Sequence, residues 1–221
     1  MNEKEFCFII CSNNELYLQE CLYYISQLIV PEGYSIDVLT VAEAKSMTTG
    51  YNEAMRCSQA KYKVYLHQDT FIVNPYFISD CLRVFQSDGR IGMLGNIGAK
   101  KLPLSGVMWE TDRFGMLYEQ HIYETVLSGN REWSVENEIQ DVEAIDGFIM
   151  VTQYDIPWRE DLFTRWDFYD VSQSMEFIRK GYRVVVPYME SPWCVHDCGF
   201  VNLERYEEER KKFVKEYLER N

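Results

Sequence analysis

The residues best suited to chemistry stand at the end of a short apolar segment. Val64-Tyr65-Leu66 leads directly into His67-Gln68-Asp69. When a buried parallel strand ends in polar side chains, these lie at the edge of the sheet where α/β folds bind ligands. Imidazole and carboxylate groups both bind divalent cations, and such a cation can hold a phosphate group. The alternative interpretation is an ordinary strand end whose polar residues cap the next element.

Two aspartates open the pattern of a helix late in the chain. Asp167 and Asp170 stand at the start of a segment, 168–180, with apolar residues at helical spacing. A carboxylate at a helix N-terminus that faces a ligand can act as a general base. The same position also suits an aspartate that only caps the helix.

A histidine follows in the run Cys194-Val195-His196-Asp197-Cys198. His196 is a candidate second metal ligand, or else a hydrogen-bonded structural histidine. In an extended segment Cys194, His196 and Cys198 would share a face. A structural zinc site needs four ligands, usually from two separate clusters, and the sequence contains no matching second cluster. The sequence therefore disfavours structural zinc.

Composition predicts one folded domain. The chain has 221 residues, of which 47% are hydrophobic and 15% aromatic, enough for a sizeable core. The net charge of -13 argues against nucleic acid as a partner. Seven cysteines without a CxxC pair suit a reducing compartment. No apolar run is long enough to span a bilayer and the first residues do not resemble a signal sequence, so we expect a cytoplasmic protein without an integral membrane segment.

The first half of the chain alternates strand and helix patterns, which predicts a largely parallel sheet flanked by helices. The predicted strands are 6–11, 36–41, 62–66 and 91–94, and the predicted helices are 16–29, 46–57 and 74–85.

The second half is less regular. Residues 99–140 have no clean period and are interpreted as an irregular excursion over the sheet, typical of a binding loop or lid. Its exposed face could support a homodimer. Regular patterns then predict a strand over 142–151, a helix over 168–180 with Val171, Met175 and Ile178 inward, a strand over 182–186 and an amphipathic helix over 203–218.

The order of these features resembles a known family. The motifs are Gly50-Tyr51-Asn52-Glu53-Ala54, His67-Gln68-Asp69, Tyr169-Asp170 and Gly181-Tyr182-Arg183-Val184 followed by Pro187. Together they resemble family 2 glycosyltransferases of the GT-A fold over nearly the whole chain. The His-Gln-Asp form and the ending Trp193-Cys194-Val195-His196-Asp197 are most similar to the StrF-type glycosyltransferase-like subgroup.

The resemblance implies a single Rossmann-like α/β domain over residues 1–221. Residues 1–98 would form the nucleotide-binding half, and 99–221 the acceptor-side half with its C-terminal helix. The implied enzyme transfers a sugar from a nucleotide-diphosphate sugar to a hydroxyl of a saccharide or other acceptor. Asp69 and His196 would hold Mn²⁺ or Mg²⁺ against the departing diphosphate. Asp170 would be the general base of an inverting displacement, with Asp167 as its competitor.

The resemblance also assigns residues to the two substrates. Those expected on the donor side are Ile10, Cys11, Ser12, Glu15, Gly50, Asn52, His67 and Gln68. Those expected on the acceptor side are Asp146, Gly147, Trp158, Trp166 and Trp193. Gly50 could equally be a helix-start glycine and Asn52 a surface amide, and each tryptophan could belong to the core.

Three positions depart from the family pattern. Where the family carries an Asp-Asp-Gly-Ser run after the second strand, this chain has only Glu43 as an acidic residue. His67 replaces the first aspartate of Asp-x-Asp, and Tyr169 replaces the glutamate before Asp170. A catalytically degenerate module that binds a sugar nucleotide or a glycan is therefore the alternative. A nucleotidyltransferase ranks last, because no glycine-rich basic loop follows the first strand.

Overall fold

A computed structural model describes residues 1–121, 125–129, 139–199 and 202–219 of the chain. Its main sheet has, within these residues, seven strands in the order β10-β13-β5-β12-β3-β1-β2. The bounds are β1 Asn2–Ser12, β2 Ser35–Ala42, β3 Ala60–His67, β5 Ile91–Gly95, β10 Ile139–Asp141, β12 Ile149–Thr152 and β13 Arg183–Pro187. Strand β1 pairs in parallel with β2 and β3, and β13 with β5, whereas β12 and β10 run antiparallel to their neighbours. The prediction of a mostly parallel sheet is confirmed.

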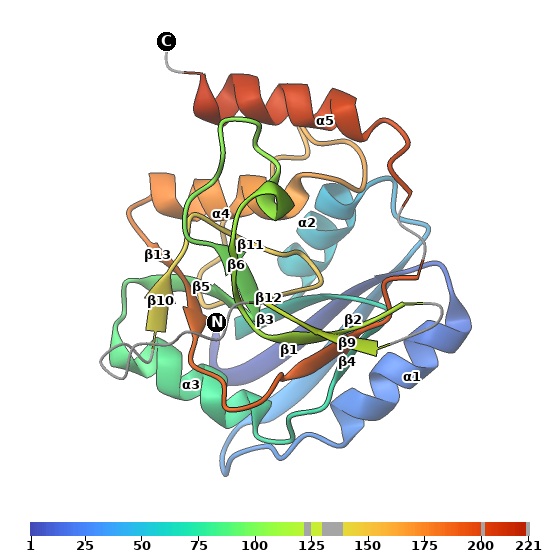
Figure 1. The fold of residues 1–221 in the computed structure, drawn as a ribbon. Helices are drawn as coiled ribbons and strands as arrows, with labels where there is room; N and C mark the ends of the chain where they lie inside the picture. The colour runs from blue at the N-terminus through green and yellow to red at the C-terminus, as the bar shows by residue number, and fades with distance from the viewer. Residues whose placement is uncertain (122–124, 130–138, 200–201, 220–221) are drawn as a thin grey trace.

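Helices cover both faces of this sheet (Figure 1). They are α1 Glu15–Ser26, α2 Met47–Cys57, α3 Phe77–Ser87, α4 Tyr169–Arg179 and α5 Tyr206–Phe213, which continues into a π-helical turn, Val214–Leu218. The aromatic ring of Phe8 contacts Phe77 in α3 on one face of the sheet. On the opposite face, Cys11 of β1 lies against Gly50 in α2. Alternate residues of one buried strand thus pack against opposite helix layers.

Short strands form two smaller sheets beside the main one. One has the order β11-β6-β7, with β6 Ile97–Ala99, β7 Arg113–Gly115 and β11 Ala144–Ile145. The other has the order β4-β14-β8-β9, with β4 Thr70–Ile72, β8 Leu117–Gln120, β9 Thr125–Ser128 and β14 Cys194–His196. The described part of residues 99–140 therefore contains strands and a 3-10 turn, Met108–Glu110, and the expectation of an irregular excursion is wrong there.

The apolar run 142–151 is two strands in different sheets, not one. The chain turns at Asp146 and Gly147, so that β11 pairs with β6 while β12 enters the main sheet between β3 and β5. A continuous apolar run is compatible with both arrangements, because its period does not reveal a turn. This turn brings Asp146 to the edge where β3 ends.

Side-chain caps fix the starts of the first two helices, whereas one helix face differs from the prediction. The Asn14 side chain accepts a hydrogen bond from Leu16 N at 3.0 Å at the start of α1, and Ser46 accepts one from Thr49 N at 3.1 Å at the start of α2. Ile178 was expected inward on α4 but is 37% exposed, because Phe177 occupies the buried face.

The last helix is shorter than predicted and covers a second apolar cluster. Leu203 lies outside α5 and is exposed. Phe213 is fully buried in this cluster with Phe163, Phe168, Leu102 and Met108. Across the described residues, no helix is long and apolar enough to cross a membrane.

Candidate active site

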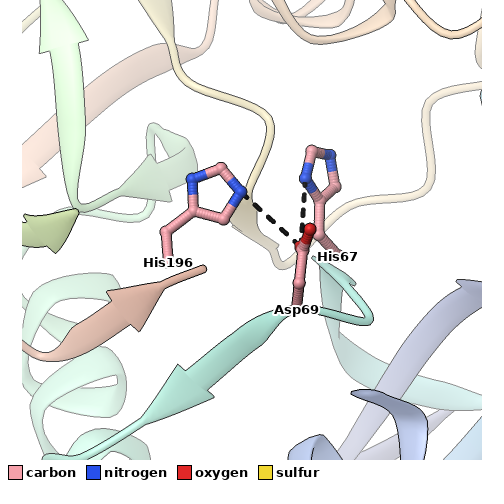
Figure 2. Close-up of side chains that lie close together, drawn as sticks. All are labelled: His67, Asp69 and His196. Carbon is pink, nitrogen blue, oxygen red and sulfur yellow. Dashed lines mark ion pairs between the residues drawn. The ribbon is translucent and has the colours of Figure 1, made fainter. Parts of the chain in front are cut away.

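Three side chains meet where β3 ends (Figure 2). His67 closes β3, Asp69 lies between β3 and β4, and His196 ends β14, which pairs antiparallel with β4. The Asp69 Oδ1 atom lies 3.8 Å from His67 Nδ1 and 3.6 Å from His196 Nε2. These three ligand atoms lie within 4.8 Å of one another. The predicted approach of Asp69 and His196 is present, and His67 adds a third group.

The donor set fits a divalent cation. Asp69 Oδ1 is buried and has no hydrogen-bond partner among the described residues, although a buried acceptor normally has one. Two ligands that are each about 2.1 Å from one ion cannot be more than about 4.2 Å apart. The two separations that involve Asp69 meet this limit. An ion among the three groups would therefore satisfy the orphaned oxygen.

The pKa values of two of the three groups favour metal binding. Burial alone would raise the pKa of Asp69, but its interaction with His196 and the charges of both histidines hold that pKa below its usual value. Burial lowers the pKa of His67, and Asp69 opposes this effect only in part. Asp69 is thus an anion and His67 a neutral imidazole, the forms in which both groups bind metals. Burial alone would lower the pKa of His196, but its interaction with Asp69 raises that pKa, so an ion would have to displace a proton from His196.

Asp170 lies at the first turn of α4 and is held by the backbone. Its Oδ2 accepts a hydrogen bond from Gly147 N at 3.0 Å, and its Oδ1 accepts one from Val171 N at 2.8 Å. Burial, helped by the charge of Asp146, raises the pKa of Asp170 to about 7. Burial and the charge of Glu209 likewise raise the pKa of Asp167 to about 6. Both carboxyls have the raised pKa typical of a general base near neutral pH.

Two clefts open beside the cluster, and His67 and Trp166 border both of them. The first cleft encloses about 610 Å³ and is lined by Cys11, Ser12, Asn13, Val41, Glu43, Ala44, Met47, His67, Gln68, Asp69 and Trp166. The second cleft encloses about 1120 Å³. Its lining includes Trp109, Arg113, Glu119, His121, Asp146, Trp166, Asp167, Asp170, His196 and Tyr206. The three-residue cluster therefore stands at the boundary between two spaces.

The sequence profile of one protein family matches almost the whole chain. The profile described as Glycosyltransferase like family matches residues 7–217. The chain belongs to the Glycosyltransferase like family. Its predicted membership of the glycosyltransferases is confirmed, while the StrF-type subgroup stays a prediction. No curated protein matches the sequence.

Solved glycosyltransferase structures share the fold. The mannosyltransferase PcManGT from Pyrobaculum calidifontis, in complex with GDP-Man and Mn²⁺, has a TM-score of 0.64 at 10% identity, over 100% of this chain and 66% of that one. S. aureus TarS has a TM-score of 0.58 at 11% identity, over 98% of this chain and 40% of TarS. GalNAc-T7 with UDP, GalNAc and Mn²⁺ has a TM-score of 0.61 at 10% identity, over 90% of this chain and 44% of GalNAc-T7. The chain thus has the GT-A fold and spans less than two thirds of each of these proteins.

On the predicted donor side, Cys11, Ser12, His67 and Gln68 line the first cleft of this glycosyltransferase-family domain. The remaining four residues lie apart from that lining. Ile10 is fully buried and Glu15 is exposed on α1, bonded to Gln19. A Cβ at Gly50 would lie 2.6 Å from Cys11 Sγ, so Gly50 permits the close packing of α2 on β1.

Asn52 makes a buried structural pair. Its Nδ2 donates to Trp158 O and its Oδ1 accepts from Trp158 N, both at 2.9 Å. The indole of Trp158 packs between Tyr51 and Tyr65, with ring centroids 4.9 and 4.8 Å away. These two predicted site residues therefore connect α2 to the segment before α4 within the core.

On the predicted acceptor side, Asp146 and Trp166 line the second cleft, and Trp166 is 49% exposed. Gly147 lies behind the lining, where its N–H donates to Asp170. Trp193 is buried against Phe77, with ring centroids 5.7 Å apart. Trp158 and Trp193 thus belong to the core, the alternative that the sequence left open.

Sequence reasoning missed several residues of the second cleft. Trp109 is 55% exposed there and packs on Tyr206 at a centroid distance of 5.2 Å. Arg113 forms an ion pair with Glu119 at 3.2 Å. His121 also lines the cleft, and as one of only three histidines it was the available signal. Trp109, Arg113 and Glu119 stand in residues 99–140, where the sequence has no clean period that could assign them to a cleft.

Proposed function

We propose that the chain transfers a sugar from a nucleotide-diphosphate sugar to an acceptor hydroxyl with the help of a divalent cation. The observation that carries this proposal is the position of the orphaned Asp69 oxygen, between two imidazoles and at the boundary of two clefts. A group transfer needs such an arrangement, because donor and acceptor must reach one reacting centre from different sides. Family membership supports the same reaction class.

The first cleft is the proposed donor site. It lies at the carboxyl ends of β1, β2 and β3, where α/β sheets bind nucleotides. Glu43 lines it and is the only acidic residue of this chain where the family resemblance predicts the Asp-Asp-Gly-Ser run that binds the base and ribose of the nucleotide. The diphosphate would lie toward Asp69, because Asp69 and His67 line the same cleft.

Asp69, His196 and His67 would hold the cation. When bound, a divalent cation neutralises the negative charge that develops on a departing diphosphate. Two imidazoles and one carboxylate favour Mn²⁺ over Mg²⁺, because imidazole nitrogen suits transition ions better than Mg²⁺.

The second cleft is the proposed acceptor site, with Asp170 as general base. Its carboxylate would accept the proton of the attacking hydroxyl, for which a pKa of about 7 is well matched. Direct attack from this side would invert the configuration at the sugar carbon. Asp167 is the competing base, and the exposed faces of Trp109 and Trp166 could stack on a saccharide ring.

A non-catalytic sugar-nucleotide or glycan-binding module is the second candidate. The observation in its favour is that both oxygens of Asp170 already accept backbone hydrogen bonds, as a purely structural carboxylate would. Donor turnover separates the two functions, because a binding module retains ligand affinity without turnover.

The test replaces Asp69 by alanine, with Asp37→Ala on the exposed edge strand β2 as the matched control. Transfer and donor hydrolysis are measured on a panel of UDP- and GDP-sugars with and without Mn²⁺. We expect Asp69→Ala to lower the Mn²⁺-dependent rate more than about 100-fold. Replacing only a residue that hydrogen-bonds to a metal ligand already lowers metal affinity or activity by about 10–100-fold. The control should match the natural chain. Unchanged metal dependence in Asp69→Ala would contradict the metal assignment.

Cytoplasmic location, homodimer formation and the division into halves at residue 98 stay predictions.

A further inference from the structure

Two departures from the family pattern contact each other. His67 stands where the family resemblance predicts an aspartate, and Tyr169 where it predicts a glutamate. These residues belong to β3 and α4, far apart in the chain. In the structure His67 Nε2 and the Tyr169 hydroxyl form a short hydrogen bond. The two departures therefore form one structural pair.

The hydrogen bond engages Nε2 of His67, so that Nδ1 is the nitrogen that faces Asp69. When Nε2–H donates to the Tyr169 oxygen, the lone pair of the ring is left on Nδ1. Nδ1 is the atom that lies 3.8 Å from Asp69 Oδ1, too far for a hydrogen bond but within the reach of a shared ion. A metal-bound histidine is commonly oriented in this way by a partner on its other nitrogen.

The surroundings of Tyr169 hold its hydroxyl in place. The ring is buried against Tyr51 and Trp158, with centroids 6.0 and 6.1 Å away. A Cβ at position 147 would lie 2.1 Å from the Tyr169 hydroxyl oxygen, so only Gly147 leaves room for it. The His196 ring stacks on Phe148 at a centroid distance of 5.2 Å and meets the His67 ring edge-on at 5.5 Å. Both imidazoles are thus oriented before any ion arrives.

We propose that Tyr169 is a positioning residue that fixes His67 as the third ligand of the metal centre, which therefore binds a transition-metal ion without nucleotide. This inference rests on the metal centre of the proposed function and extends it. A centre held only by Asp69 and His196 would need phosphate oxygens to complete it. Three protein ligands, in contrast, suffice for catalytic metal sites. Two histidines and one carboxylate are a ligand set that binds transition ions. Mg²⁺ should bind poorly without nucleotide.

The experiment titrates the nucleotide-free protein with Co²⁺, followed by visible absorption, and with Mn²⁺, followed by electron paramagnetic resonance. Tyr169→Phe removes only the hydroxyl that contacts His67. Tyr51→Phe is the matched control, because Tyr51 is equally buried in the same aromatic cluster and its hydroxyl has no partner among the described residues. Circular dichroism checks that both variants fold.

We expect the natural chain and Tyr51→Phe to bind one Co²⁺ with the same absorption bands. Tyr169→Phe should bind it about 10–100-fold more weakly and with altered bands. Equal affinity and equal bands in Tyr169→Phe would overturn the positioning role. Binding that requires a UDP- or GDP-sugar would overturn the three-ligand centre, whether or not Tyr169→Phe folds. In either case Mn²⁺-dependent transfer by the natural chain would still support the proposed function, so the two failures are distinguishable.

Discussion

The Asp170 carboxyl combines two properties that a general base needs. Backbone N–H groups of Gly147 and Val171 fix its orientation, and burial with the nearby charge of Asp146 raises its pKa to about 7. A carboxylic acid with an ordinary pKa would be a poor proton acceptor at neutral pH. The cost is that part of the population is protonated, and inactive as a base, below neutrality.

This pKa gives a prediction for the pH dependence of transfer. Because Asp170 must be ionised to accept a proton, kcat/KM should rise as the pH increases through about 7. Asp170→Asn should lower kcat by about 10²–10⁴-fold and remove this rising limb. The measurement is kcat/KM between about pH 5.5 and 9 at saturating Mn²⁺. Asp167→Asn is the comparison: if that variant alone loses the limb, Asp167 is the base.

At the scale of elements, one amide connects the exit of β1 to the end of β3. Gln68 Oε1 accepts hydrogen bonds from Ser12 Oγ at 2.9 Å, from Asn13 N at 3.0 Å and from Asn14 N at 2.9 Å. Its Nε2 donates to Asn13 Oδ1 at 2.7 Å. Gln68 therefore shapes the wall of the first cleft through the loop before α1.

Replacing Gln68 by leucine should leave these donors without their acceptor. We expect a loss of about 1–3 kcal/mol in the free energy of unfolding, together with weaker donor binding. Urea unfolding and titration with UDP- and GDP-sugars measure the two effects. Gln19→Leu, on the exposed side of α1, is the control. Unchanged stability in Gln68→Leu would contradict this role of the amide.

The sequence predicted the helices and most strands of the main sheet well, but the short strands of the two smaller sheets and the contacts between distant elements less well. The sequence could place His67 and His196 at the same edge of the sheet. The alternation of strands and helices and the order of the family motifs together predict this. The role of Asn52 could not be predicted, since both amide groups bond to the backbone of Trp158, 106 residues away. The contact between His67 and Tyr169 has the same character: each departure was visible, but their meeting was not.

At the scale of the whole molecule, α5 forms one wall of the second cleft through Tyr206. Phe213 anchors this helix, fully buried beside Phe168 and Tyr217. A Cβ at Gly106 would lie 2.8 Å from the Phe213 ring, and Gly106 has a φ of +76°, so the opposing loop is shaped to receive that ring.

Removing the anchor should therefore affect stability and acceptor binding together. Phe213→Ala is expected to lower the free energy of unfolding by about 3–5 kcal/mol. It should also reduce acceptor-dependent transfer more than donor hydrolysis, since the first cleft does not include α5. Thermal unfolding and the two rates are the measurements. Leu16→Ala, at an exposed position of α1, is the control, and an equal loss of both rates in Phe213→Ala would contradict the proposed division of the clefts.

The two histidines of Figure 2 come from two different sheets. His67 ends a strand of the main sheet and His196 ends a strand of the four-stranded one, with most of the second half of the chain between them. An ion held by both would be a removable cross-link that closes a very long loop, and its binding energy would be part of the folding energy. At a free ion concentration of 100 times its Kd the link is worth about 2.7 kcal/mol. Metal supply would then adjust the free energy of unfolding as well as the rate of turnover.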